Sequence, residues 1–340
     1  MAQQNRILLA HGSGGRLSHD LIANEFVPPW DNPILSRLND SAVFRVGDGA
    51  SPKLAFSTDS YVVKPLFFKG GDIGRLAVCG TVNDLAMSGA TPLYLSAGFV
   101  IEEGLLLSDL RKVVRSMREA ADEAGVEIVA GDTKVVERGS ADGLFINTAG
   151  LGVVPPDVEI SGDGAQVGDV VLLSGSIGDH GVAVLSEREG LDFESPVSSD
   201  AAPLNHLVEA MLKAGRNIHV LRDPTRGGLA TSLNEIAAQS GVGITMREDA
   251  IPLHDGVWAA CEMLGLDPLY VANEGKLIAV VAATEAEAVL AAMRDSKYGE
   301  EAAIIGEVVA EPAGKVLMKT AVGGTRVVHV LTGELLPRIC

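Results

Sequence analysis

The stretch between residues 57 and 92 constrains the fold more than any other part of the chain. An apolar strand is predicted to reach its end near Asp59, and Asp72 can cap a helix that runs to Gly89. A second apolar strand, residues 91–100, follows this helix directly. A strand, a helix and a strand in close succession are typical of an α/β fold.

The same alternation continues on both sides of this stretch, which indicates α/β structure throughout. The expected helices cover residues 18–26, 108–124, 178–190, 203–214, a segment that opens at 228, and 285–294. The expected strands cover residues 42–46, 53–57, 126–130, 145–153, 169–174, 276–282 and 302–309.

A chain of 340 residues is too long for one small core, so two domains are expected. The best candidate boundary is the pair Pro155-Pro156. We therefore predict an N-terminal α/β domain at residues 1–155, a C-terminal α/β domain at 156–329, and a flexible tail at 330–340.

Composition excludes several classes of function. A net charge of -18 argues against nonspecific binding to nucleic acid or to anionic lipid. It also means that a polyanionic ligand such as a nucleotide would need divalent cations. Three cysteines give neither a disulfide framework nor a CxxC metal pair. No apolar stretch reaches the length of a membrane span, and we expect a cytoplasmic protein.

The chain ends in a cysteine, Cys340. Gly333 loosens the approach to it, and Pro337 prevents a helix from running to the end. One interpretation is a movable arm with a nucleophile at its tip. The other is a frayed terminus without a role. The two remaining cysteines, Cys79 and Cys261, fall in apolar surroundings and are expected to be inert core residues.

Acidic residues recur at the edges of the predicted strands. Asp40, Asp59 and Asp132 each lie at such an edge, and Asp84 lies on the helix between them. If the strands share a sheet, these acids converge, and oxygen ligands of this kind suit Mg²⁺ bound with phosphates. A single aspartate such as Asp84 could equally bond a nearby backbone. Lys134 could neutralise phosphate, act as a base, or be an ordinary surface lysine.

Two glycine-rich segments could contact an anion. Residues 11–15 read His-Gly-Ser-Gly-Gly, and a turn of this kind exposes backbone N–H groups. Residues 222–228 read Arg-Asp-Pro-Thr-Arg-Gly-Gly and open a helix. Asp223 in the second segment would repel phosphate unless a metal lies between them.

Four of these segments together resemble the superfamily of aminoimidazole-ribotide synthetase, formylglycinamidine synthase and selenophosphate synthetase. They are Ser57-Thr58-Asp59, the run from Asn83 to Pro92, Gly131-Asp132-Thr133-Lys134 and the run from Asp223 to Gly228. The opening His-Gly-Ser-Gly-Gly and the terminal Pro-Arg-Ile-Cys resemble one branch of it, the HypE family of carbamoyl dehydratases. The resemblance runs nearly from end to end.

This resemblance implies a homodimer whose N-terminal domains join in a shared β-barrel, with ATP near the interface. It implies that the thiol of Cys340 receives a carbamoyl group from the carbamoyltransferase HypF and is converted to a thiocyanate. The cyano group would then pass to iron held by a HypC–HypD complex, for a [NiFe] hydrogenase.

The resemblance also implies roles for individual residues. Cys340 would carry the substrate group, and Lys134 and Glu274 would act on its amide, although which of them is the base stays open. Mg²⁺ would be held by Asp40, Asp59, Asp84, Asp132 and Asp223. The positions expected to contact ATP are Lys64, Asn83, Asp84, Asp132, Thr133, Asp223, Arg226, Gly227 and Gly228.

Two other functions fit the same residues less closely. The first is another ATP-dependent synthetase of the superfamily, of the selenophosphate or aminoimidazole-ribotide type. The opening residues lack the reactive cysteine or selenocysteine of the selenophosphate enzymes, which counts against that type. The second is a nucleotide-gated carrier without catalytic activity, which would use Cys340 to dock a metal or a partner protein.

Overall fold

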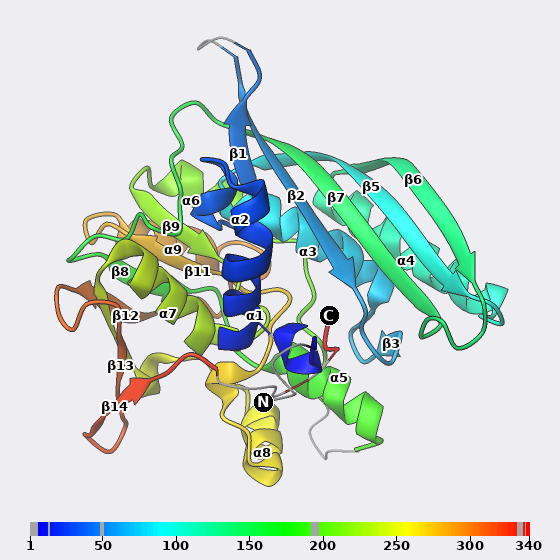
Figure 1. The fold of residues 1–340 in the computed structure, drawn as a ribbon. Coiled ribbons are helices and arrows are strands. Elements are labelled where there is room, and N and C mark those ends of the chain that lie inside the picture. Colours follow the sequence, from blue (N-terminus) through cyan, green and yellow to red (C-terminus); the bar gives the residue numbers. More distant parts are fainter. Residues whose placement is uncertain (1–5, 13, 48–50, 192–196, 332–335, 337) are drawn as a thin grey trace.

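The computed structural model describes residues 6–12, 14–47, 51–191, 197–331, 336 and 338–340. The chain forms two α/β halves that stand side by side, each built around its own mixed sheet (Figure 1). The prediction of a two-domain α/β protein is confirmed. Pro155 and Pro156 lie between the last strand of the first sheet and the first strand of the second.

The N-terminal sheet has the strand order β1-β2-β7-β5-β6. Its neighbouring strands are antiparallel except for β5 and β6, which are parallel. The bounds are β1 Ala42–Arg45, β2 Lys53–Tyr61, β5 Thr91–Glu102, β6 Glu127–Val136 and β7 Leu144–Val154, beside a small hairpin of β3 Phe67–Phe68 and β4 Gly71–Asp72. The helices of this half are α1 Arg16–Leu21, α2 Val27–Trp30, α3 Ile73–Met87 and α4 Leu107–Ala124.

Helices α3 and α4 cover one face of the N-terminal sheet (Figure 1). Helix α3 begins where the sequence predicts, because Asp72 Oδ1 accepts hydrogen bonds from Gly74 N at 2.7 Å and Arg75 N at 3.1 Å. It is buried on nearly every side, since the second domain packs against it opposite the sheet. Its lack of amphipathic patterning is the signature of this central position.

The opposite face of the N-terminal sheet is uncovered. Nine of the ten residues of β6 are exposed, although the strand is rich in apolar residues. Large apolar side chains also stand exposed on β5, which neighbours β6, and on β2. The exposed apolar residues on these three strands are Phe56, Leu93, Tyr94, Val100, Ile128, Val129 and Val135.

The C-terminal sheet has the strand order β14-β13-β10-β12-β8-β11-β9. The strands are β8 Val170–Leu173, β9 Ile218–Arg222, β10 Gly243–Arg247, β11 Ile278–Val281, β12 Ala303–Val309, β13 Val316–Lys319 and β14 Thr325–Val328. The helices are α5 Asp179–Glu189, α6 Asn205–Ala214, α7 Gly228–Ser240, α8 Asp255–Leu264 and α9 Ala286–Arg294. Short helical turns occur at Leu9–Gly12, Ile22–Phe26, Leu35–Arg37, Glu248–Ala250 and Pro268–Tyr270.

The start of α1 lies against the segment that leads to the tail. The backbone N–H of Arg16 donates to the carbonyl of Leu331 at 3.1 Å, which ties the start of α1 to the approach of the tail. No helix in the described ranges is both long enough and apolar enough to span a bilayer.

Two predicted strand boundaries are wrong, and both affect the expected site. Strand β2 continues to Tyr61, so Asp59 lies within it rather than at its end. Strand β6 continues to Val136, so Asp132 and Lys134 lie inside a strand rather than in a loop after it. In both cases pairing with a long neighbour, β7 or β5, extends the strand through polar residues.

Candidate active site

The centre of the candidate site is a group of acids between the two domains. Ser57 and Asp59 lie on the same face of β2, turned toward α3. The Ser57 hydroxyl donates a hydrogen bond to Asp84 Oδ2 at 2.6 Å. Burial raises the pKa of Asp84 well above its usual range, and the charges of Asp223, Asp59 and Asp40 raise it further. These four acids, far apart in sequence, therefore share one electrostatic environment.

The second domain contributes its acids at the end of β9. Arg222 closes that strand, and its Nε lies 3.3 Å from Asp40 Oδ1. Burial raises the pKa of Asp223, which follows directly, to about 7, and Asp40 adds to the effect. Burial also raises the pKa of Asp40, although Arg222 opposes this. The buried carboxylates outnumber the two arginines whose charges they affect, Arg222 and Arg226, so the site favours an added cation.

Glu274 stands on a rigid turn beside this cluster. The neighbouring Asn273 donates to the Pro224 carbonyl through its backbone at 3.2 Å and through Nδ2 at 2.8 Å. Glu274 N in turn donates to Asp200 Oδ1 at 3.0 Å. Within the described residues, the buried Oε1 of Glu274 has no hydrogen-bond partner. Burial, with Asp223 and Asp59, raises the pKa of Glu274 well above its usual range.

The tip of the tail is seated against the end of β2. Val62 N donates to the Cys340 carbonyl oxygen at 3.1 Å, and Lys64 N donates to the Arg338 carbonyl at 3.3 Å. Arg338 Nε donates back to the Val62 carbonyl at 3.1 Å. Ile339, only 3% exposed, joins the core of the N-terminal domain, and Cys340 packs beside it. The last residues thus add a short strand-like segment to the first domain.

This seat places the thiol of Cys340 beside the acids and Arg226. Burial raises the pKa of the thiol far above its ordinary value, and the charge of Glu274 adds to this, while Arg226 opposes it. The same proximity raises the pKa of Arg226. The docked thiol is therefore protonated at neutral pH and a poor nucleophile. The positive charge that acts on the thiol is that of Arg226. Arg338, two residues before Cys340, instead forms an ion pair with Asp142.

The glycine-rich segment 222–228 also reaches this place. Gly227 and Gly228 open α7 with φ angles of +81° and +61°. A Cβ on Gly228 would lie 2.6 Å from the Leu269 carbonyl oxygen, so only glycine permits this close approach. No side chain within the described residues caps α7, which leaves its first N–H groups available to an anion.

The opening segment lies against the same arginine. Arg226 Nη1 donates to the Gly12 carbonyl at 3.3 Å. A Cβ on Gly14 would lie 2.5 Å from Arg226 Cβ, and one on Gly15 would lie 2.5 Å from the Leu331 carbonyl oxygen. Two glycine-rich segments more than 200 residues apart therefore meet at Arg226. Ser13, between them, lies outside the described residues.

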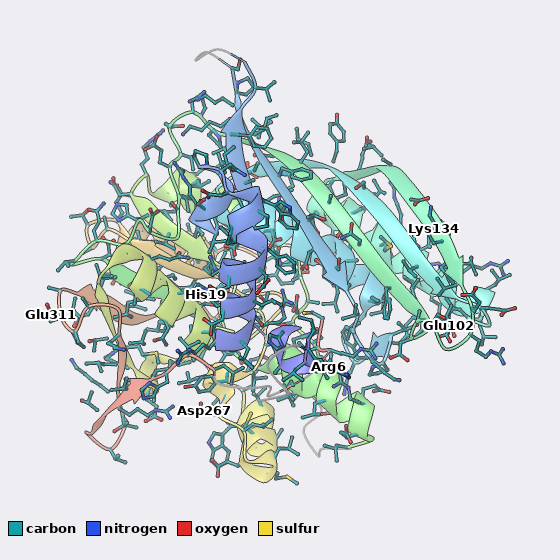
Figure 2. All side chains as sticks on the ribbon, in the orientation of Figure 1. Arg6, His19, Glu102, Lys134, Asp267 and Glu311 are labelled. Carbon is teal, nitrogen blue, oxygen red and sulfur yellow. The ribbon has the colours of Figure 1, made fainter. Side chains whose placement is uncertain are left out.

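Three expected site residues lie elsewhere in the chain. Asp132, Thr133 and Lys134 are exposed on β6, the strand of the N-terminal sheet farthest from β1. Lys134 is labelled at that outer edge in Figure 2, away from the C-terminus seen in Figure 1. Lys134 Nζ lies 2.5 Å from Asp132 Oδ2, and this hydrogen bond lowers the pKa of Asp132. Within one chain, these residues do not meet Asp84 or Glu274.

Two further expected contacts have partners within the protein. The Asn83 amide joins the domains: Nδ2 donates to the Ala202 carbonyl at 3.0 Å, and Oδ1 accepts from Leu204 N at 2.8 Å. Lys64 Nζ lies 3.1 Å from Asp142 Oδ1, close to the seated tail. Their roles toward a nucleotide stay predictions.

The acids fit a divalent cation that is shared with a phosphate. In the described part of the chain, no three His, Cys, Asp or Glu side chains come close enough to hold a metal ion by themselves. Mg²⁺ commonly takes only one or two carboxylates and completes its shell with water and phosphate. A cavity of about 890 Å³ is lined in part by Asn39 and Ser41, on either side of Asp40, although none of the clustered acids lines it. Its volume is within the range of small-molecule sites.

Sequence reasoning missed two elements of the site. The sequence pattern places Arg222 in the expected phosphate-binding segment, whereas its guanidinium pairs with Asp40. His180, on α5, was not singled out, yet its Nε2 lies 2.8 Å from the Ile339 carbonyl oxygen. A histidine one residue after a glycine-rich turn carries no pattern that would reveal this contact. Cys79 and Cys261 are buried, as predicted, and burial raises their pKa values to about 12 and about 11.

Comparison with known proteins places this geometry in a family. Models of the AIR synthase related protein match over residues 38–154 for the N-terminal domain and 166–319 for the C-terminal domain. The carbamoyl dehydratase HypE of Cupriavidus necator is 56% identical over 338 residues, which cover 99% of this chain and 96% of the relative. The chain belongs to the HypE family of carbamoyl dehydratases.

Solved structures agree with this assignment. A hydrogenase maturation protein HypE in complex with ATP is 54% identical, with a TM-score of 0.82, and the match covers 98% of this chain and 100% of the other. A HypE–HypF complex contains a chain that is 50% identical, with a TM-score of 0.87 and coverage of 92% and 99%.

Proposed function

We propose that this protein uses ATP to dehydrate an S-carbamoyl group on its own Cys340 to a thiocyanate. The product would supply the cyanide ligand for the iron centre of a [NiFe] hydrogenase. The observation that carries the proposal is the seat of Cys340, which brings the last residue of the chain to Glu274, Arg226 and the buried acids. A terminus without a role would have no reason to be threaded into such a site.

The chemistry needs a good leaving group in place of the amide oxygen. Transfer of the γ-phosphoryl group of ATP to that oxygen produces ADP and an activated carbamoyl group. Loss of phosphate and of the two amide protons then forms the C≡N bond, with the sulfur–carbon bond retained. The sum is one ATP consumed, with ADP, inorganic phosphate and one proton released for each thiocyanate.

Each part of the site has a role in this sequence. Asp40, Asp59, Asp84 and Asp223 would hold Mg²⁺, which neutralises the phosphates for in-line transfer when it is bound. Arg226 and the uncapped start of α7 would contact phosphate oxygens. Glu274, with a free buried oxygen, would accept an amide proton. The core around Ile339 excludes water from the activated group.

The exposed residues Asp132, Thr133 and Lys134 belong to a second subunit's site in this proposal. The uncovered face of the N-terminal sheet carries the apolar patch expected of an interface. A homodimer that joins these faces in a shared barrel would cover the patch and bring Lys134 of one chain toward Glu274 of the other. Lys134 would then neutralise phosphate or share the work of the base.

Loading and delivery require the tail to leave its seat. A protonated, buried thiol cannot attack an activated carbamoyl donor, so carbamoylation by HypF would occur on the released tail. The tail would then return for dehydration, and leave again to give its cyano group to iron on a HypC–HypD complex. The relative solved together with HypF supports the first of these encounters.

One experiment separates this function from its rivals. The protein is incubated with its carbamoyltransferase, carbamoyl phosphate and ATP, and the C-terminal peptide is weighed by mass spectrometry. We expect a carbamoyl adduct on Cys340 that becomes a cyano adduct when the dehydratase can use ATP. A carrier would give neither adduct, and a small-molecule synthetase would turn over ATP equally well as Cys340→Ala.

A further inference from the structure

His180, near the start of α5, is fully buried beside the last residues of the chain. Its Nε2 lies 2.8 Å from the Ile339 carbonyl oxygen, and its Nδ1 lies 2.8 Å from Ser199 Oγ. The Phe68 ring packs edge-on against it at a centroid distance of 5.5 Å. A histidine enclosed in this way has no access to solvent, so both ring nitrogens depend on these two contacts.

The partners determine where the proton of the ring lies. A carbonyl oxygen can only accept, so Nε2 must carry the hydrogen that it donates to Ile339. Burial lowers the pKa of His180, which keeps the ring neutral, and Nδ1 therefore accepts from the Ser199 hydroxyl. Ser199 Oγ also accepts from Ala201 N at 3.1 Å, which orients its own hydrogen toward the ring. The ring is thus held with its Nε2 hydrogen available to one carbonyl oxygen.

That carbonyl belongs to Ile339, the penultimate residue of the tail. On the opposite side, the backbone of Val62 holds the Cys340 oxygen and the side chain of Arg338. Without the bond from His180, the Ile339 carbonyl would be a buried acceptor in an apolar core, where an unpaired group costs free energy. The bond therefore exists only when the tail is seated, and it is lost whenever the tail departs.

We propose that His180 is the positioning residue that holds the tip of the tail in the site, by donating a hydrogen bond from Nε2 to the carbonyl of Ile339. The proposal concerns where Cys340 resides, and its relevance to dehydration rests on the function proposed above. Because the seat and the released state compete for the tail, a weaker bond shifts the chain toward release. The hydrogen bonds of His180 go to the Ile339 carbonyl and to Ser199, so it acts on Cys340 through the peptide that it binds.

The test measures the accessibility of the Cys340 thiol without ATP or any partner protein. The full-length protein is treated with iodoacetamide, and alkylation of each cysteine is followed by mass spectrometry. His180→Leu, which fills the space without donating, should increase the rate at Cys340 about fivefold to tenfold, the effect of losing one hydrogen bond. His180→Gln, whose amide can donate from a similar position, should restore a rate near that of the wild type.

Cys79 and Cys261 report on folding in the same sample, since both are buried. Faster alkylation of Cys340 with both others still protected supports the proposal. Alkylation of Cys340 at the wild-type rate in a folded His180→Leu protein contradicts it. If Cys79 also becomes reactive, the His180→Leu protein has unfolded. The variant Ser199→Ala then tests the proposal in its place. This change removes the hydroxyl that orients the ring and that accepts from Ala201 N, so it should accelerate alkylation of Cys340 selectively, and an unchanged rate overturns the proposal.

A second readout connects the bond to the reaction. In a single turnover of carbamoylated protein with ATP, His180→Leu should slow formation of the cyano adduct, and His180→Gln should recover it. If thiol accessibility rises but cyanation is unaffected, the bond holds the tail without serving dehydration. If no variant, nor the wild type, forms a cyano adduct, the proposed function fails while the alkylation result still stands.

Discussion

At the scale of single residues, the site is a set of carboxylates that the fold forces together. Sequence patterns placed Asp40, Asp59, Asp84 and Asp223 in a common site, and the structure brings their charges within mutual influence. Burial is the first cause of the raised pKa values of Asp40, Asp84 and Asp223, and nearby aspartates raise those of Asp84 and Asp223 further. Bringing these carboxylates together therefore costs free energy, which a bound cation with a nucleotide would offset.

The contribution of Asp223 to the free energy of unfolding depends on pH. Its pKa is about 7 in the folded chain and roughly 3.9 when unfolded. The folded state binds the proton more tightly, so this group's contribution to stability is full below about pH 4 and is lost as the pH rises toward 7. Asp223→Asn should flatten that fall in the free energy of unfolding, measured in denaturant without nucleotide.

The exposed Asp132 provides the control for this measurement, since its pKa is lowered rather than raised. Asp132→Asn should leave the fall in stability between pH 4 and 7 in place. A wild-type protein whose stability rises steadily over this range, with Asp223→Asn indistinguishable from it, would show that Asp223 is not strained by its neighbours.

Glu274 should be needed for the second half of the reaction only. Glu274→Gln keeps the shape of the side chain but removes the base, so we expect cyanation to slow by about 10²-fold or more while Cys340 is still carbamoylated. Both steps can be read from the mass of the C-terminal peptide. Glu311→Gln, at the outer edge of the C-terminal domain in Figure 2, should change neither step. Normal cyanide yield from Glu274→Gln would exclude Glu274 as the base.

At the scale of elements, the sequence predicted most of the structure that surrounds the site. The cap at Asp72, helix α3 and the strand after it are where the pattern places them, because capping and apolar runs are local signals. The lengths predicted for β2 and β6 are too short, because pairing across a sheet is not a local signal. For the same reason, the seat of the tail against Val62 could not be read from the chain.

The position of the tail against Val62 predicts that the chain cannot be extended beyond Cys340 without loss of activity. Two or three residues added after Cys340 would have to enter the core or the acidic site, so cyanation should be abolished even when the thiol can be carbamoylated. The same residues inserted at Val322, a turn position that is 95% exposed, should be tolerated. Full activity of the C-terminal extension would mean that the terminus is not inserted during the reaction.

At the scale of the whole molecule, the site is divided between domains and, in our proposal, between subunits. The two halves meet along α3, where Asn83 joins them, and the acids converge at this junction. The sequence predicted Lys134 as a member of the site, but one chain leaves it on an uncovered sheet. A single sequence does not reveal whether a strand contributes to the site of its own chain or to that of another subunit.

Subunit mixing tests this division. Lys134→Ala and Glu274→Gln should each lose most of the cyanation activity when alone. If the two residues come from different chains, a mixed dimer contains one intact site, and an equal mixture should recover about a quarter of wild-type cyanation. No recovery from co-refolded or co-expressed variants, with mixed dimers verified by mass, would place both residues in the site of one chain.

The central claim is that the carbamoyl group of the seated Cys340 is activated by phosphorylation of its oxygen in this site. The most direct measurement starts from protein carbamoylated with ¹⁸O in the carbamoyl oxygen and adds ATP and Mg²⁺ in a single turnover. The account predicts that the label leaves in inorganic phosphate as the cyano adduct forms. Unlabelled phosphate, formed together with the cyano adduct, would contradict it.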